Sequence, residues 1–485
     1  MEAITPELIP FIIRPLTLRT ATDERPNTVS YETAIAQMYA LGHELATTPS
    51  HKFDLAHMRV LLGALGHPEK KVTSVLIAGT NGKGSTSATL AAILQASGLK
   101  TGLYTSPHLV RINERIRLDG SPIPDDDFAM LHDVVGRTAE RLVSEGDLPW
   151  HPSFFEMLTA MAFEYFSRTG PDIVVLEVGM GGRLDATNVV EPKLSIITDI
   201  ALDHQQYLGS TVREIAREKA GIIRPGSVVV TLPQMPEAND VIGNTILDQG
   251  ARAISAVQYV PPVSPGSSEF WARANHDSAD KQSGTPRSRY PLQVMGQQIL
   301  VESPLLGRHQ LRNIALAIAS AEELHNQGFA QITPRSIEQG IRDTRWPGRF
   351  QVVPATGGSP EIVLDVAHNP AGAWALRSTL SAAYEDRKVT LVFGVMRDKA
   401  IAEVAEILFP IAEHVVLTQA NNPRSATSAE IRQAASRVQT DIQESPDVPS
   451  ALAKARQIAG PGGLVVVTGS IYIVGEMMRT LGARI

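Results

Sequence analysis

The chain has 485 residues, 43% of them hydrophobic, and a formal net charge of −7. This length exceeds what one hydrophobic core supports, so we expect two or three domains, and the acidic balance argues against a protein that binds nucleic acid. The sequence contains no cysteine, which excludes disulfides, thiolate catalysis and cysteine-ligated metals.

Residues 1–30 are predicted to form an N-terminal extension with little pattern. The apolar stretch Leu8–Ile13 within them is short and is interrupted by Pro10. Neither a signal peptide nor a membrane-spanning helix fits such a stretch. We therefore expect a cytoplasmic protein without a membrane partner.

Residues 31–344 are predicted to form an α/β domain built around a glycine-rich turn. The apolar run Val72–Ala78 predicts a buried strand of a parallel sheet, and apolar residues at helical spacing predict a helix from Ser85. Between them lies Gly79–Gly84, which contains Lys83. Glycines let backbone N–H groups approach a phosphate, the helix start adds partial positive charge, and a lysine reaches the terminal phosphates. The sequence therefore predicts a phosphate-binding loop (P-loop).

This loop departs from the common GxxxxGK[ST] pattern. Ile77 stands in place of the first glycine, and Gly84 separates Lys83 from Ser85. The alternative is an ordinary glycine-rich turn without a ligand. The order of apolar strand, turn, lysine and helix favours a P-loop of a particular kind.

Two further predicted strands end in oxygen-bearing side chains. Lys100–Tyr104 leads to Ser106, and Ile173–Val178 carries Glu177 near its end. Ligands of open parallel sheets collect at the C-terminal ends of strands, and Mg²⁺ needs oxygen ligands beside nucleotide phosphates. Glu177 is therefore a candidate metal ligand, whereas Ser106 fits equally well as a hydroxyl that begins the turn at Pro107.

Three later segments carry polar residues with two possible roles. The predicted helix Ser153–Phe166 begins with a capping box in which Glu156 satisfies the backbone of the cap. His204 lies in the loop after the predicted strand Leu194–Asp199, and Lys219 lies in a helix that Thr211 caps. A single histidine or lysine in such a place is more often structural than functional.

The next strand, Ser227–Leu232, is predicted to close the main series. Residues 261–291 are dense in proline, serine and glycine without periodicity, so we expect a flexible insertion there. The segment Gly307–Asn313 opens an alanine-rich helix, Ile314–Leu324.

Residues 345–485 are predicted to form a second, smaller α/β domain. Four apolar strands are each followed by a helical segment: Glu361–Ala367, Val389–Val395, His414–Thr418 and Leu464–Thr468. The loops after these strands carry polar residues, as at the C-terminal edge of a parallel sheet. We therefore expect a nucleotide in a cleft between the two domains.

The sequence resembles the folylpolyglutamate synthase/dihydrofolate synthase family, a branch of the Mur ligases. The resemblance covers about Leu41 to the C-terminus in eight ordered segments: GTNGKGS from Gly79, TSPHLVRINERIR from Thr105, LEVGMGGRLDATN from Leu176, ALDHQQYLG from Ala201, REKAGI from Arg217, GRHQLRN from Gly307, PGRF from Pro347 and DVAHNP from Asp365. It implies a P-loop domain with a mostly parallel sheet, followed by a smaller Rossmann-like domain, with ATP between them.

The resemblance also implies roles for individual residues. Those matched to the ATP site are Thr80, Asn81, Gly82, Lys83, Gly84, Asn313, Arg349, Asp365 and His368. Those matched to two Mg²⁺ sites are Ser106, Glu177, His204 and Lys219, the last as a carbamate formed from CO₂. Those matched to the pterin-containing substrate are Ser153, Phe154, Phe155, Glu156, Leu184, Asp185 and Ala186. Lys83, His204 and Lys219 are the implied catalytic residues.

The implied reaction is ATP-dependent formation of an amide through an acyl phosphate. L-Glutamate is joined to dihydropteroate, to the glutamate tail of a reduced folate, or to both, by a protein that we expect to be monomeric. Another Mur ligase, acting on a UDP-linked cell-wall precursor, would use the same phosphate chemistry, but such enzymes usually have GKT where this chain has Gly84 after Lys83. A P-loop switch protein is a third interpretation, and the guanine-selective Asn-Lys-x-Asp motif is absent.

Overall fold

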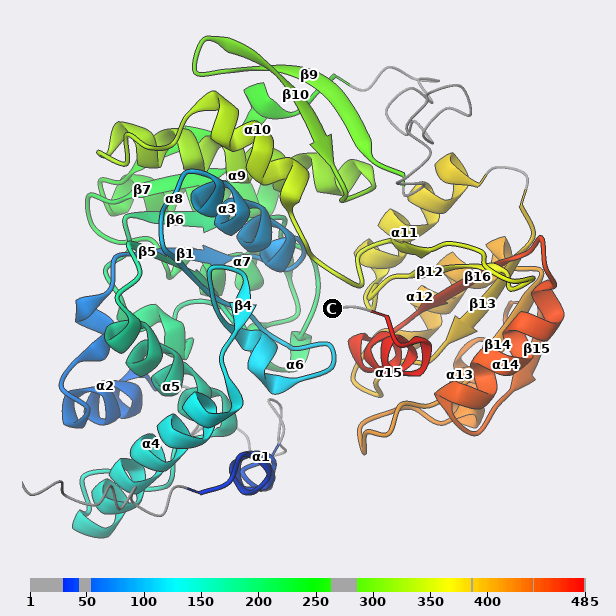
Figure 1. Ribbon diagram of the computed structural model, residues 1–485, viewed down its shortest axis with the longest axis horizontal. Helices are drawn as coiled ribbons and strands as arrows, with labels where there is room; N and C mark the ends of the chain where they lie inside the picture. Colours follow the sequence, from blue (N-terminus) through cyan, green and yellow to red (C-terminus); the bar gives the residue numbers. More distant parts are fainter. Residues whose placement is uncertain (1–28, 43–53, 263–285, 385–386, 439, 484–485) are drawn as a thin grey trace, which may run out of the picture.

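A computed structural model of the chain describes residues 29–42, 54–262, 286–384, 387–438 and 440–483. It contains two α/β units that follow each other along the chain, one coloured blue to green and the other yellow to red in Figure 1. Nearly all of the predicted N-terminal extension, residues 1–30, lies outside the described residues, as do residues 263–285 of the predicted insertion.

The first unit is built on an eight-stranded sheet. Its strand order is β4-β3-β2-β5-β1-β6-β7-β8. The bounds are β1 (Ser74–Ala78), β2 (Thr101–Tyr104), β3 (Ile116–Leu118), β4 (Ser121–Pro122), β5 (Ile173–Glu177), β6 (Leu194–Ile197), β7 (Val228–Thr231) and β8 (Arg252–Ser255). The central strands β5, β1 and β6 are parallel and buried along their whole length, as expected for apolar strands between two layers of helices. Only the β2-β3-β4 edge is antiparallel.

Helices cover both faces of this sheet because successive side chains of β1 point in opposite directions. Val75 and Ile77 pack in one core with α3 (Lys83–Ala96), α9 (Arg308–Asn326) and α10 (Pro334–Asp343). Leu76 and Ala78 belong to the opposite core. That core includes α1 (Tyr31–Ala40), α2 (Leu55–Ala64), α4 (Asp125–Glu145), α5 (Phe154–Thr169), α7 (Val212–Ala220) and α8 (Pro236–Asp248).

The predicted end of the strand series at Ser227–Leu232 is wrong. β7 pairs in parallel with β8, a largely exposed strand whose sequence RAIS has no apolar run. The predicted C-terminal boundary of the insertion at residue 291 is also wrong. Residues 288–291 begin β9 (Ser288–Val294), which forms a hairpin with β10 (Gln297–Ser303). Burial alternates at the start of β9, and Pro291 occupies an exposed position, as is usual for proline in an edge strand.

The second unit has a six-stranded sheet with the order β11-β12-β16-β13-β14-β15. The four predicted strands are confirmed as β12 (Glu361–Leu364), β13 (Val389–Phe393), β14 (His414–Leu417) and β16 (Leu464–Thr468). Two short strands were not predicted, β11 (Gln351–Val353) and β15 (Asp441–Glu444). The helices are α11 (Pro370–Ala383), α12 (Ile401–Leu408), α13 (Ser428–Ala434), α14 (Val448–Ala459) and α15 (Ile471–Leu481).

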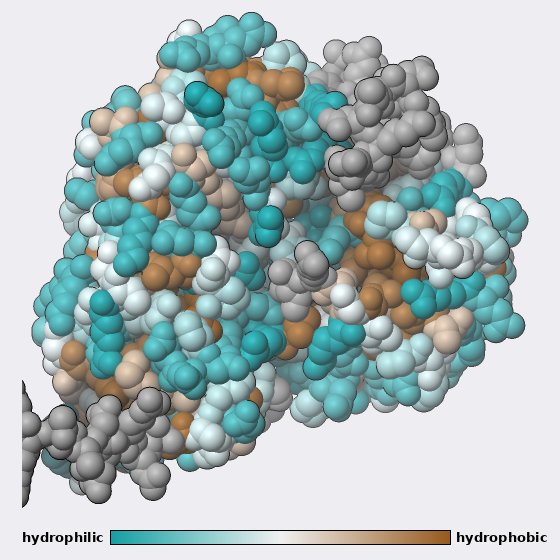
Figure 2. All heavy atoms as spheres, in the orientation of Figure 1, coloured by the Kyte–Doolittle hydropathy of each residue, from teal (hydrophilic) through white to brown (hydrophobic). Residues whose placement is uncertain are grey.

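These two sheets confirm the predicted fold class, a P-loop unit with a mostly parallel sheet and a second, smaller α/β unit. The domain boundary at residue 345 stays a prediction. Hydrophilic side chains cover most of the face shown in Figure 2, and hydrophobic ones form small separate patches there. None of the helices in the described part of the chain has the length and apolarity to cross a membrane.

Candidate active site

A cleft of about 590 Å³ lies between the two units. On the first unit it is lined by the P-loop, the ends of β5 and β6 and the start of α9, and on the second by the loop after β12. The structure brings into this cleft every residue that the sequence assigned to ATP: Thr80, Asn81, Gly82, Lys83, Gly84, Asn313, Arg349, Asp365 and His368.

The P-loop joins β1 to α3, and α3 begins at Lys83, two residues before the predicted start. Gly82 caps this helix with a φ of 90°, and a Cβ atom there would lie 2.1 Å from the Asn313 Oδ1 atom. Only glycine fits such a backbone and such a close approach. The Lys83 ammonium folds back and donates to the carbonyl oxygens of Gly79 (3.1 Å) and Thr80 (3.2 Å). The loop therefore presents a helix N-terminus and a cation to the same cleft.

Lys219 reaches the same loop from α7 (Val212–Ala220). The predicted cap at Thr211 is present as a capping box with Glu214, and it starts α7 so that Lys219 falls in the last turn. The Lys219 side chain is buried, and its Nζ atom donates to the carbonyl oxygen of Gly79 at 2.7 Å. Burial, reinforced by the charge of Lys83, lowers the pKa of Lys219 to about 7. At neutral pH the Lys219 amine is therefore uncharged and nucleophilic in a large fraction of the molecules.

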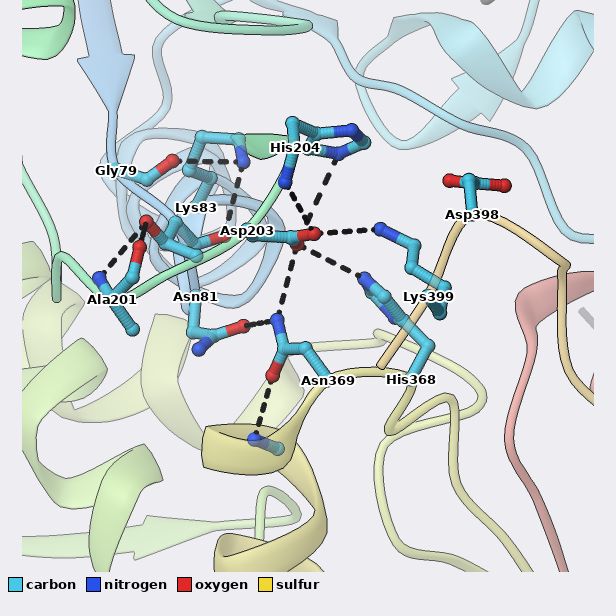
Figure 3. Close-up of polar contacts among 12 residues, drawn as sticks. Gly79, Asn81, Lys83, Ala201, Asp203, His204, His368, Asn369, Asp398 and Lys399 are labelled. Carbon is cyan, nitrogen blue, oxygen red and sulfur yellow. Dashed lines mark hydrogen bonds and ion pairs between the residues drawn. The ribbon is translucent and has the colours of Figure 1, made fainter. Parts of the chain in front are cut away.

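The loop after β6 carries Asp203 and His204 into the space between the units (Figure 3). Burial lowers the pKa of His204 to about 3 against the opposing charge of Asp203, so the imidazole is neutral and offers a lone pair. Burial would raise the pKa of Asp203, but a hydrogen bond from His368 and the charges of His204 and Lys399 outweigh it and hold that pKa well below its usual range. Asp203 is therefore a carboxylate at neutral pH.

The four residues assigned to metal ions, Ser106, Glu177, His204 and Lys219, all line the cleft. The backbone N–H of Ser106 donates to the Glu177 carboxylate at 3.1 Å, which brings a hydroxyl and a buried carboxylate together at neighbouring strand ends. No three histidine, aspartate or glutamate side chains form a metal cage within the described residues. Mg²⁺ commonly takes only one or two protein oxygens and completes its shell with water and phosphate, so the side-chain oxygens of Ser106 and Glu177 fit one Mg²⁺ ion.

A second pocket of about 230 Å³ adjoins the cleft. It contains every residue that the sequence assigned to the pterin-containing substrate: Ser153, Phe154, Phe155, Glu156, Leu184, Asp185 and Ala186. Eight residues line both pockets: Ser106, Pro107, Gly179, Met180, His204, Arg349, Val366 and His368. A molecule in one pocket therefore meets a molecule in the other across this shared wall.

The acidic residues of the second pocket also have structural partners. Glu156 accepts from the backbone N–H (2.8 Å) and the hydroxyl (2.6 Å) of Ser153, which confirms the predicted cap of α5. Asp185 accepts from the backbone of Met180 and from the backbone and hydroxyl of Thr187. Burial nonetheless raises the pKa of Asp185. Both carboxylates are thus fixed in place where they face the pocket.

Asp365 and Arg349 connect the second unit to the cleft. The Asp365 carboxylate accepts from the backbone N–H groups of Phe350 (2.8 Å) and Ala367 (2.9 Å), which ties the start of the second unit to the end of β12. Burial raises the pKa of Asp365 and lowers that of Arg349, while the opposite charges of the two residues resist both shifts. This arrangement gives the cleft a cation on the side opposite the P-loop.

Sequence reasoning missed part of both pockets. His309 and Arg312 line the cleft from α9, and the Arg312 guanidinium binds the Asp199 carboxylate at 2.6 Å. The second unit supplies more of the substrate pocket: Met396, Lys399, Arg424, Ser470, Ile471 and Tyr472. Most of these lie in or beside the polar loops after β13, β14 and β16, whose position at strand ends was the available signal.

Comparisons with known proteins match both units of the chain. The Mur ligase middle domain matches residues 154–321, and the Mur ligase, glutamate ligase domain matches residues 348–471. The dihydrofolate synthase/folylpolyglutamate synthase of Bacillus subtilis is 32% identical over 432 residues, which are 88% of this chain and 94% of the relative.

Solved structures match over most of the chain as well. Mycobacterium tuberculosis folylpolyglutamate synthase, complexed with ADP and AMPPCP, matches with a TM-score of 0.80 and 30% identity over 93% of this chain and 99% of the other. Escherichia coli FolC, in complex with DHPP and ADP, matches with a TM-score of 0.76 and 29% identity over 94% and 100%. The chain belongs to the dihydrofolate synthase/folylpolyglutamate synthase family of Mur ligases.

Proposed function

We propose that this ligase joins L-glutamate both to dihydropteroate and to the glutamate tail of reduced folates, as a cytoplasmic monomer. The observation that carries the proposal is the shared wall between a polar P-loop cleft and a smaller pocket that contains Phe154, Phe155 and Leu184. Relatives solved with ADP and with DHPP support the assignment of the two pockets to nucleotide and pterin substrate.

The reaction has two steps. A carboxylate oxygen of the acceptor attacks the γ-phosphorus of ATP, the bond from that phosphorus to the β,γ-bridging oxygen breaks, and ADP leaves. The amino group of glutamate then attacks the acyl carbon of the acyl phosphate, loses a proton and expels phosphate. Because two anions must meet in the first step, catalysis depends on fixed positive charge. Lys83 supplies such charge from the P-loop and Arg349 from the second unit.

The residues of the cleft suit two Mg²⁺ ions. Ser106 and Glu177 would hold one ion, and His204 with a carbamate on Lys219 would hold the other. When bound, such ions neutralise phosphate charge and orient the phosphoryl group. The neutral imidazole of His204 is the form that a ligand needs, since its pKa lies at about 3.

The carbamate proposed on Lys219 requires an uncharged amine. A neutral lysine nitrogen adds to the carbon of CO₂ and releases a proton, which converts a cation site into an anion with two hard oxygen atoms. Burial of Lys219 and a pKa of about 7 provide the neutral amine. The charge change matters because a divalent cation prefers oxygen anions to an ammonium group.

The test of this function is ADP release with L-glutamate and one acceptor at a time. We expect turnover with dihydropteroate and with tetrahydrofolate. Turnover with tetrahydrofolate alone would remove the dihydropteroate half of the proposal. Turnover only with a UDP-linked peptide precursor would overturn the folate assignment in favour of a cell-wall ligase.

A further inference from the structure

The Asp203 carboxylate binds across the cleft to the second unit (Figure 3). Its Oδ1 atom lies 2.8 Å from the Lys399 Nζ atom. Its Oδ2 atom accepts a hydrogen bond from the Asn369 side-chain amide at 3.2 Å and lies 3.6 Å from the His368 Nε2 atom. All three partners belong to the second unit, in the loops after β12 and β13. One carboxylate of the first unit therefore joins two separate loops of the second.

The ion pair between Asp203 and Lys399 is buried. Each side chain is only 9% exposed, whereas Lys388 and Glu413, a pair inside the second unit, are 80% and 43% exposed. An exposed pair is largely screened by water and contributes little. Removing one partner of a buried pair leaves an uncompensated charge, which strongly disfavours the arrangement that buries it. The Asp203–Lys399 pair therefore depends on the two units staying together.

The same contacts extend to the nucleotide loop and to His204. The Asn369 amide also donates to the Asn81 side chain at 3.1 Å, so Asn369 bridges the P-loop and Asp203. Asn369 is held in this orientation because its own Oδ1 atom caps α11 at the Gly372 N–H. On its other side, Asp203 Oδ1 accepts the backbone N–H of His204 at 2.9 Å. Closure of the units and placement of His204 thus share one carboxylate.

The pair also crosses the wall between the pockets. Asp203 lines the nucleotide cleft, and Lys399 lines the substrate pocket. We propose that Asp203 is a positioning residue that, with Lys399 as its partner, holds the second unit closed over the P-loop and so completes the shared wall. The activity part of this inference rests on the proposed ligase function, whereas the closure part does not.

Closure can be measured directly because the sequence contains no cysteine. Asn244→Cys in α8 and Ala402→Cys in α12 place a donor and an acceptor dye at exposed positions, one on each unit. We expect Asp203→Asn and Lys399→Met each to lower the ratio of closed to open molecules at least roughly tenfold in single-molecule energy transfer. The control Lys388→Met removes a lysine from an exposed pair of the second unit and should leave the ratio unchanged.

Activity provides the second readout through a double-mutant cycle. If the two residues act as one pair, kcat/KM falls at least about tenfold in each single variant, and the double variant is no worse than the worse single one. The proposal would be overturned if the losses in kcat/KM multiply in the double variant. It would also be overturned if the ratio of closed to open molecules is unchanged in Lys399→Met. If circular dichroism shows that Asp203→Asn does not fold, Lys399→Met alone tests the proposal. Absence of ligation by the parent protein would defeat the proposed function and leave the closure result intact.

Discussion

The nucleotide cleft and the substrate pocket are built in different ways. Most cleft residues follow a strand directly: Gly79–Ser85 after β1, Glu177 at the end of β5 and Asp365 after β12. The substrate pocket is assembled from helix starts and loops of both units, including the cap of α5 and residues Arg424 and Ser470. Phosphate chemistry thus depends on local strand ends, whereas acceptor choice depends on how distant segments pack.

This difference predicts separable effects. Changes in the cleft should reduce turnover with every acceptor, because they act on ATP. Changes in the substrate pocket should alter the KM of the acceptor and leave the KM of ATP unchanged. A variant that mixes the two patterns would show that the pockets do not act separately.

The largest effect is expected for Lys219→Ala. This variant removes the nitrogen that would carry the carbamate, so we expect no measurable ligation with either acceptor. Acetate or formate should partly restore activity, because a small carboxylate fits the space left by the side chain and replaces the lost anion. A crystal structure with bound Mg²⁺ that shows an unmodified ammonium far from the metals would rule this account out.

A somewhat smaller effect is expected for Lys83→Ala. Loss of one electrostatic stabiliser commonly lowers kcat by roughly a hundred- to a thousandfold. The decrease should be the same for dihydropteroate and tetrahydrofolate, since Lys83 lies in the P-loop and does not line the substrate pocket. Near-normal ligation by the folded variant, or a decrease confined to one acceptor, would contradict the assignment.

Phe155→Ala should weaken binding of the acceptor without affecting ATP. The Phe155 ring lines the substrate pocket and packs against Gly179, where a Cβ atom would lie 2.5 Å from the ring. Removing its apolar surface should raise the acceptor KM about tenfold without changing the KM of ATP. Leu247→Ala, at a side chain that is 77% exposed in α8, is the matched control and should change neither value.

The last effect concerns the pH dependence of stability at the edge of the cleft. Burial lowers the pKa of His309 to about 4, against the opposing charge of Asp199. As the pH falls below about 6.5, His309 therefore binds a proton in the unfolded chain before it does so in the folded protein. The free energy of unfolding present above this pH is consequently lost progressively toward pH 4.

His309→Gln tests this effect on stability. As the pH falls over that interval, the free energy of unfolding measured by urea titration should decrease less steeply in the variant than in the parent. The two slopes should differ by at most about 1.4 kcal/mol per pH unit. Identical pH slopes in the two proteins would show that His309 is not buried in its neutral form.

The same contrast explains what the sequence could and could not predict. The P-loop, Glu177 and the cap of α5 were predictable because a short run of residues determines each of them. The partners of Asp203 were not, because Lys399 is 196 residues away along the chain and meets it only when the units pack. β8 was missed because an exposed edge strand has no apolar run, and β9 because its proline resembles a loop signal.

The central claim is that the acceptor carboxylate and the γ-phosphate of ATP meet at the wall shared by the two pockets. It is tested most directly with dihydropteroate that carries ¹⁸O at both oxygens of its carboxylate, unlabelled ATP and L-glutamate, with mass spectrometry of the phosphate released. The account predicts that each phosphate contains one ¹⁸O atom, because the oxygen that attacks phosphorus leaves with it. Unlabelled phosphate accompanying full formation of the glutamylated product would contradict it.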